Sequence, residues 1–149
     1  MSTNDVVESI AEDLRNAWAK GPYEAADAQI AHFAEKFEMT HNPPSAGDGV
    51  LELDALRAGR NMELDAFMKA MPDFREEAEI TVEGDKINVE LTISGTLADG
   101  ETLKAKIPTV YTVKDGKIVS MLATLDPEFM TKLFTALSSV GFEYPGMEG

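Results

Sequence analysis

The sequence contains no cysteine, which excludes disulfides, thiolate nucleophiles and thiolate metal sites. Basic residues are scarce, because 13 Lys and Arg face 27 Asp and Glu and leave a formal net charge of -14. This acidic excess repels a phosphate backbone and an anionic membrane surface, so we expect no nucleic-acid or membrane partner. No apolar run approaches the roughly 18 residues of a membrane span, and the first residues do not resemble a signal peptide, so we expect a cytoplasmic protein.

Motifs for metals and nucleotides are missing as well. The sequence has two histidines, His32 and His41, which are not at the spacing of a ligand pair, and it has no His-Glu-x-x-His motif. It has neither a phosphate-binding glycine loop nor a dinucleotide fingerprint. We therefore expect a protein that uses no cofactor and no metal.

The first half of the chain has the apolar spacing of helices. This spacing predicts one helix over residues 4–20 and a second helix, opened by Gly21-Pro22, whose apolar stripe extends to Phe37. Residues 37–42 then alternate in polarity, which predicts a short strand that enters a loop. From Leu51 to Met71 the pattern is helical again, and we expect an interruption near Gly59.

The second half is rich in Ile, Val and Thr, which favour strands. Four strands separated by tight turns are predicted over residues 78–83, 86–96, 102–113 and 117–124. Asp126-Pro127 then has the pattern of a helix N-cap followed by proline at the first helical position. Helices that precede an antiparallel sheet indicate an α+β fold with the helices on one sheet face, and the length suits one domain over residues 1–149 with a tail at 141–149.

Several short motifs lie in a characteristic order along residues 5–138. They are His41-Asn42-Pro43-Pro44, Gly59-Arg60, Met71-Pro72-Asp73-Phe74, Gly95, Asp115-Gly116-Lys117-Ile118 and Asp126. Together with the order of elements, they resemble the nuclear-transport-factor-2-like superfamily, in its polyketide-cyclase-like (SnoaL-like) and ketosteroid-isomerase-like branch. The resemblance implies a cone-shaped fold, in which a curved antiparallel sheet wraps around N-terminal helices, with a C-terminal helix, an apolar cavity and a homodimer.

His41 is the strongest candidate for a catalytic residue. It shares a strand face with Phe37 and Met39, and the resemblance implies a place at the mouth of the cavity. A histidine there can act as a general base near neutral pH. The alternative is a structural histidine that hydrogen-bonds the Pro43-Pro44 loop.

Arg60 and Tyr111 are the other two catalytic candidates. Arg60 lies on an apolar helical stripe, where a charge needs a partner, either a substrate oxyanion or an internal acid, unless a break at Gly59 leaves it in solvent. Tyr111 lies in a predicted strand, and its hydroxyl could donate into the cavity or sit at the edge of the core or of an interface.

A further group of residues is predicted to bind the substrate, although most of them suit a core equally well. They are Trp18, Met39, Asn42, Met121 and Leu125. Asn42 stands where the isomerases carry their general-base aspartate, so the resemblance does not imply a steroid-isomerase mechanism. In some cyclase-like members the counterpart of Asp126 is an acid/base, but the local sequence favours a helix cap.

Two functional hypotheses follow. The first is a cofactor-independent lyase, isomerase or cyclase that acts on a hydrophobic small molecule, such as those of aromatic-compound catabolism. His41 would move the proton, and Tyr111 and Arg60 would hold a developing oxyanion. The second is a non-catalytic small-molecule-binding or dimerisation module of the same fold, which the scarcity of acid/base groups favours. In either case, Phe142 and Tyr144 of the tail are predicted to close the cavity mouth or to seal an edge of the sheet.

Overall fold

The computed structural model describes residues 3–42, 44 and 48–141, without the side chains of residues 3, 4, 58–61 and 63. Residues 45–47 of the loop predicted over residues 45–50, and the tail from 142 onward, therefore lie outside the described residues. The elements, in chain order, are α1 (Thr3–Lys20), α2 (Pro22–His32), β1 (Phe33–Asn42), β2 (Gly49–Glu52), α3 (Leu53–Ala70), β3 (Arg75–Glu83), β4 (Lys86–Thr96), β5 (Thr102–Lys114), β6 (Lys117–Thr124) and α4 (Pro127–Ser139).

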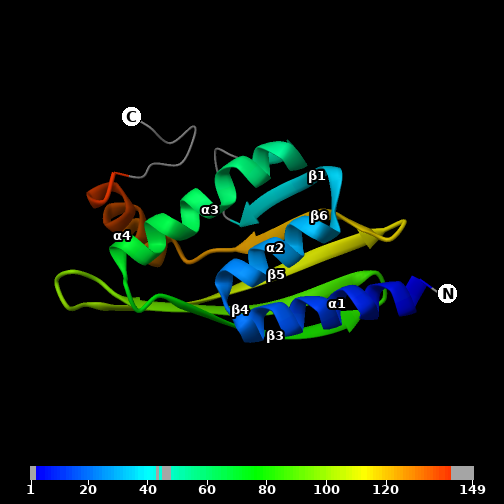
Figure 1. Ribbon diagram of the computed structural model, residues 1–149, viewed down its shortest axis with the longest axis horizontal. Helices are drawn as coiled ribbons and strands as arrows, with labels where there is room; N and C mark the ends of the chain where they lie inside the picture. The colour runs from blue at the N-terminus through cyan, green and yellow to red at the C-terminus, as the bar shows by residue number, and fades with distance from the viewer. Residues whose placement is uncertain (1–2, 43, 45–47, 142–149) are drawn as a thin grey trace.

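The strands form one curved sheet in the order β2-β1-β6-β5-β4-β3. All neighbours are antiparallel except β1 and β6, which run parallel. The register shifts once between Phe33 and Glu38 and once between Thr112 and Val113, and such bulges bend a sheet. Helices α1, α2 and α3 lie on the same face of this sheet (Figure 1). The expected α+β fold is therefore confirmed.

The start of β1 differs from the prediction. The apolar stripe that extends to Phe37 predicts a helix, but the helix ends at His32 and the strand begins at Phe33. Residues four apart share one face in a strand as well as in a helix, so the spacing of Phe33 and Phe37 fits both. In the structure their rings stack, with centroids 4.3 Å apart.

Two features of the next segment also differ from the prediction. Residues 49–52 form the short strand β2, which pairs with β1 through Met39 opposite Gly49 and Phe37 opposite Leu51. Helix α3 then continues through Gly59 without the expected interruption. A single glycine lowers helix stability by only about 1 kcal/mol, which packing of the apolar face can offset.

The buried apolar side chains form two clusters. The α1–α2 cluster lies between those helices and the sheet; its largest fully buried side chains are Val7, Leu14, Phe37, Ile87, Val89 and Ile118. The α3–α4 cluster lies at the other end of the sheet; it includes Leu64, Phe67, Met71, Phe129, Leu133 and Leu137. Gly95 of β4 lies so close to the α3–α4 cluster that an added Cβ would be 2.7 Å from Sδ of Met71.

Helix α4 begins as the local sequence predicts. Asp126 is its N-cap, and its carboxylate accepts a hydrogen bond of 3.1 Å from the backbone N–H of Glu128. Pro127 occupies the first turn, where its missing N–H costs nothing. The capping role of Asp126 is confirmed. Within the part of the chain that the structure describes, no helix is long and apolar enough to cross a membrane.

Candidate functional site

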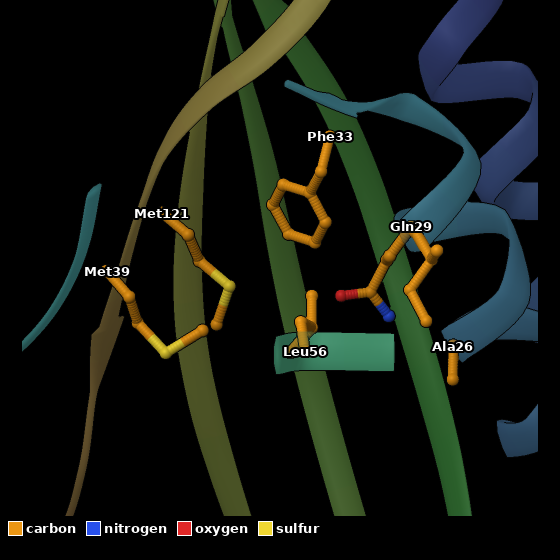
Figure 2. A pocket seen from close by; sticks show the side chains of 7 residues that line it. Ala26, Gln29, Phe33, Met39, Leu56 and Met121 are labelled. Carbon is orange, nitrogen blue, oxygen red and sulfur yellow. The ribbon is translucent and has the colours of Figure 1, made fainter. Parts of the chain in front are cut away.

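A small cavity lies between α2, α3 and the sheet (Figure 2). Its lining residues are Ala26, Gln29, Ile30, Phe33, Met39, Leu56 and Met121. The volume open to the centre of a water molecule is about 10 Å³, which is room for one water. The protein's own side chains therefore fill most of the space that the fold encloses.

Two of the predicted substrate-binding residues, Met39 and Met121, form one wall of this cavity. They are direct neighbours in the register of the parallel β1–β6 pair, and both are half-buried. Figure 2 shows both thioethers on the side of the cavity opposite Gln29. Methionine is unbranched and changes rotamer readily, so this wall can move to admit a larger molecule.

A buried hydrogen bond links β5 to the cavity-lining Gln29 of α2. The Tyr111 hydroxyl, on a residue only 2% exposed, donates to Oε1 of Gln29 over 2.7 Å. Gln29 is 4% exposed, and its Nε2 donates to the backbone carbonyl of Ala25 over 3.1 Å. The hydroxyl that the sequence predicts as a donor to substrate is thus already engaged.

Sequence reasoning missed Gln29, although a signal was present. It lies three residues after Ala26 on the buried side of α2, where a lone polar side chain needs a buried partner. That partner, Tyr111, is 82 residues further along the chain and cannot be identified from spacing.

His41 forms a pair with Asp48, a residue that sequence reasoning also missed. His41 Nδ1 lies 2.5 Å from Oδ1 of Asp48, and the backbone N–H of His41 donates to Oδ2 over 3.0 Å. The two side chains are 20% and 17% exposed. When the imidazole is neutral, this contact places its hydrogen on Nδ1 and leaves Nε2 as the acceptor.

The His41–Asp48 contact also has a structural consequence. Asp48 directly precedes β2. Because Gly49 pairs with Met39, Asp48 lies next to β1, the strand that carries His41. The contact therefore fixes both ends of the connection between β1 and β2. A role in holding this loop and a role as a base are compatible in one side chain.

The sheet register places His41 next to the cavity rather than in its lining. His41 and Met39 are on the same face of β1, about 7 Å apart along the strand. Their rows continue across the sheet, with Met39, Met121 and Tyr111 in one and His41, Ala123 and Thr109 in the next. Strand spacings put the Cα atoms of His41 and Tyr111 roughly 12 Å apart, a distance that a molecule with two rings spans.

The other predicted residues lie away from the described lining. The Trp18 indole belongs to the α1–α2 cluster and donates from Nε1 to Glu76 Oε1 over 2.9 Å. Asn42 is exposed at the end of β1, where its backbone carbonyl accepts a hydrogen bond of 2.9 Å from the backbone N–H of Leu125. Leu125 is half-buried just after β6.

Arg60 is placed only by its backbone. It lies in α3, four residues after the cavity-lining Leu56, and its side chain lies outside the described residues. Among the residues whose side chains are described, no group of three or more His, Asp or Glu could hold a metal ion.

One protein family and several solved structures match this chain. The family described as SnoaL-like domain matches residues 11–121. Among solved structures, a SnoaL-like polyketide cyclase from Jannaschia sp. CCS1, so described without proof of activity, is 16% identical, with 91% of this chain and 93% of that chain covered and a TM-score of 0.60. No curated protein matches significantly.

Two further structures are similar in fold. The BvnE pinacolase from Penicillium brevicompactum is 15% identical, with 95% of this chain and 100% of that chain covered and a TM-score of 0.63. A protein of unknown function from Burkholderia pseudomallei, described as nuclear-transport-factor-2-like, is 20% identical, with 91% and 99% covered and a TM-score of 0.63. At these identities the likeness extends to the fold alone.

Proposed function

Because the chain belongs to the SnoaL-like domain family, we propose that it is a cofactor-independent enzyme that moves a proton on a hydrophobic small molecule. The observation that carries this proposal is the His41–Asp48 pair beside an apolar cavity. The reaction would be an isomerisation, a cyclisation or a lyase cleavage, each of which includes proton transfer next to a carbonyl group. Similar folds described as a polyketide cyclase and a pinacolase are consistent with such chemistry.

In this proposal His41 is the general base. Asp48 accepts the hydrogen of Nδ1, so the Nε2 lone pair is available to take a proton from the substrate. The resulting imidazolium would be stabilised by the Asp48 carboxylate at 2.5 Å. The two side chains are 20% and 17% exposed, so water screens this charge interaction only in part.

The developing oxyanion would be held from the other side of the cavity. Arg60 would supply a positive charge from α3, and Tyr111 would act through Gln29, to which its hydroxyl already donates. Substrate entry would require Met39 and Met121 to move, since the closed cavity has room for one water.

Deuterium exchange tests the proposal without the natural substrate. 2-Acetylnaphthalene carries methyl protons next to a carbonyl, and NMR in D₂O measures their exchange. We expect the wild type to exceed the buffer rate and His41→Ala to lose about 100-fold of that acceleration. His32→Ala is the matched control, because His32 pairs with Asp13 at 2.8 Å on the surface between α1 and α2. Equal rates in the wild type and His41→Ala would contradict the proposal.

The nearly filled cavity favours a second candidate, a non-catalytic binding module. Such a module would bind 2-acetylnaphthalene and leave its methyl protons at the buffer exchange rate. The exchange experiment therefore distinguishes the two candidates when binding is measured in the same samples.

We also propose that the chain forms a homodimer through the sheet face opposite α1–α3. Leu122 of β6 is 42% exposed on that face, where its register neighbours are Val110 of β5 and Thr40 of β1. Sedimentation at micromolar concentration should give twice the chain mass of 16.2 kDa. Leu122→Glu should shift the protein to monomer, and a monomeric wild type would contradict the proposal.

A further inference from the structure

We infer that Gln29 selects the ligand by donating a hydrogen bond from its side-chain amide to a ligand oxygen. The cavity would then take flat apolar molecules that carry a carbonyl or a similar acceptor, in preference to hydrocarbons of the same shape. This inference rests on the proposed function insofar as both require a ligand in the cavity. It adds the polar group that the ligand must carry and the residue that recognises it.

The first step is the donor capacity of the Gln29 amide. Nε2 carries two hydrogens, and the described residues provide one acceptor for it, the backbone carbonyl of Ala25 at 3.1 Å. The other six lining residues, all apolar, offer a ligand no competing polar side chain. Figure 2 shows the amide on the α2 side of the cavity, with Oε1 turned toward Met121 and Nε2 turned toward Ala26, where a ligand oxygen would have to reach it.

The second step is the orientation of this amide. Tyr111 donates to Oε1 over 2.7 Å, while Nε2 donates to the carbonyl of Ala25. A flipped amide would turn Oε1 toward that carbonyl, so two acceptors would face each other and both hydrogen bonds would be lost. Tyr111 is thus a positioning residue that keeps the N–H side of Gln29 in place before any ligand arrives.

The third step is the environment of the donor. Gln29 and Tyr111 are 4% and 2% exposed, so bulk water does not compete for the amide hydrogen. A buried site built to donate a hydrogen bond rejects an analogue without the acceptor, because its own donor then stays unpaired. The discrimination would therefore depend on the oxygen of the ligand rather than on its size.

The fourth step is space for the ligand. A ring system cannot enter a volume of about 10 Å³ unless side chains move. Met39 and Met121, adjacent in the register of β1 and β6, form the wall opposite the amide and can swing aside. The moved thioethers would contact the apolar body of the ligand, while Gln29 would bind its oxygen.

A matched pair of compounds tests the inference. 2-Acetylnaphthalene and 2-isopropenylnaphthalene have nearly the same shape, but only the ketone carries an acceptor. Calorimetric titration of the wild type should give about 10-fold tighter binding of the ketone, as one hydrogen bond provides. In Gln29→Met, which keeps the side-chain length, the preference should fall to about one while the hydrocarbon affinity is retained.

Tyr111→Phe tests the positioning role, because it removes only the hydroxyl. The ketone preference should fall to roughly 3-fold, since the amide can then flip, whereas a purely structural defect would weaken both compounds equally. A measurement on the wild type keeps the inference testable if a variant does not fold. The ¹³C carbonyl resonance of the bound, labelled ketone should move downfield from its position in cyclohexane.

Three results would overturn the inference: equal binding of both compounds to the wild type, an unchanged preference in Gln29→Met, or an unshifted carbonyl resonance. Each leaves the proposed proton transfer by His41 standing, because a ligand still occupies the cavity, and removes only Gln29 from the binding of the ligand oxygen. The double variant Met39→Ala, Met121→Ala widens the cavity. It distinguishes failure of this inference alone from failure of the inference together with the proposed function. If neither compound binds to it or to the wild type, the cavity takes no such ligand, and the inference and the proposed function both fail.

Discussion

The two ends of the sheet are built differently, although β4 and β5 contribute side chains to both. The α3–α4 cluster is filled by apolar side chains, and at Gly95 the backbone approaches Met71 too closely for a Cβ. Near the α1–α2 cluster, two buried polar residues interrupt the apolar packing, Gln29 at the cavity and Thr109 in the row of His41. One end is thus close-packed scaffold, and the other keeps polar groups, a movable methionine wall and a residual cavity.

This difference has an energetic meaning. The buried side chains of a close-packed cluster stabilise the fold by their packing. Because no space is left between them, an added methyl group forces its neighbours out of position. A buried polar group contributes little net stability, because its hydrogen bonds replace equally good ones to water. The ligand roles proposed for Gln29, Tyr111 and His41 would therefore explain these polar residues where a contribution to stability does not.

Asp48→Asn sharpens this comparison most, because it should strongly lower the proposed exchange activity and leave the stability of the fold nearly unchanged. Asp48 accepts two donors, the backbone N–H of His41 and its Nδ1–H. An Asn oxygen would face the backbone N–H, so its amide would donate to Nδ1 and move the ring hydrogen to Nε2. The base is then blocked, as in triads with the same change, and deuterium exchange should fall about 100-fold.

The control for this variant is Asp13→Asn, which alters the carboxylate beside the other histidine. It should leave the exchange rate of 2-acetylnaphthalene within about two-fold of the wild type, since surface pairs contribute little. If Asp48→Asn keeps the full rate, the pair only fixes the loop between β1 and β2, and the base lies elsewhere.

Gly95→Ala tests the filled end and should act in the opposite way. The new Cβ would lie 2.7 Å from Sδ and 2.8 Å from Cβ of Met71, so the cluster must shift. We expect a loss of about 2 kcal/mol in the free energy of unfolding, measured in urea, with the exchange rate of the folded protein unchanged. In a Met71→Gly background, which removes both of these Met71 atoms, the same change should cost clearly less, and an equal cost in both backgrounds would exclude this contact as the cause.

Much of the sheet could be predicted because its signals are local. Alternating polarity and the turns between strands give the observed bounds of β4 and β6, and Asp126-Pro127 marks the start of α4. The start of β1 could not be located, because Phe33 and Phe37 fit a helical and a strand face equally. Strand β2 was missed because four residues are too few to show a period, and its pairing with β1 is tertiary.

The candidate site was predictable only in its conspicuous residues. His41, Met39, Met121 and Tyr111 stand out as chemical groups on strand faces, and the structure places all four in two adjacent rows. Their partners are polar residues brought in from elsewhere, which no spacing reveals: Asp48 by the β1–β2 pairing and Gln29 from helix α2.

The smallest expected effect concerns the contact that joins the two ends. Tyr23 of α2 donates from its hydroxyl to Oδ1 of Asp65 of α3 over 2.5 Å. This hydrogen bond, with smaller contributions from burial and from the Asp65 charge, raises the pKa of Tyr23 from 10.0 to about 12. The folded state therefore favours the neutral phenol, so the stabilisation is fully present below pH 10 and is lost as the pH rises through 12.

Tyr23→Phe should remove this pH dependence at a small cost. At pH 8 we expect the variant to unfold about 0.5 kcal/mol more easily, because the lost hydrogen bond is partly exposed. Between pH 10 and 12 the wild type should lose stability relative to the variant, because only the wild type has this phenol to ionise, and subtraction of the two profiles cancels the titration of other groups. A constant difference across that range would exclude a shifted Tyr23. Because Tyr23 is not one of the residues that line the cavity, the ketone preference should stay near 10-fold. A changed preference would mean that α2 transmits the state of the filled end to Gln29, and the two ends would then be one coupled unit.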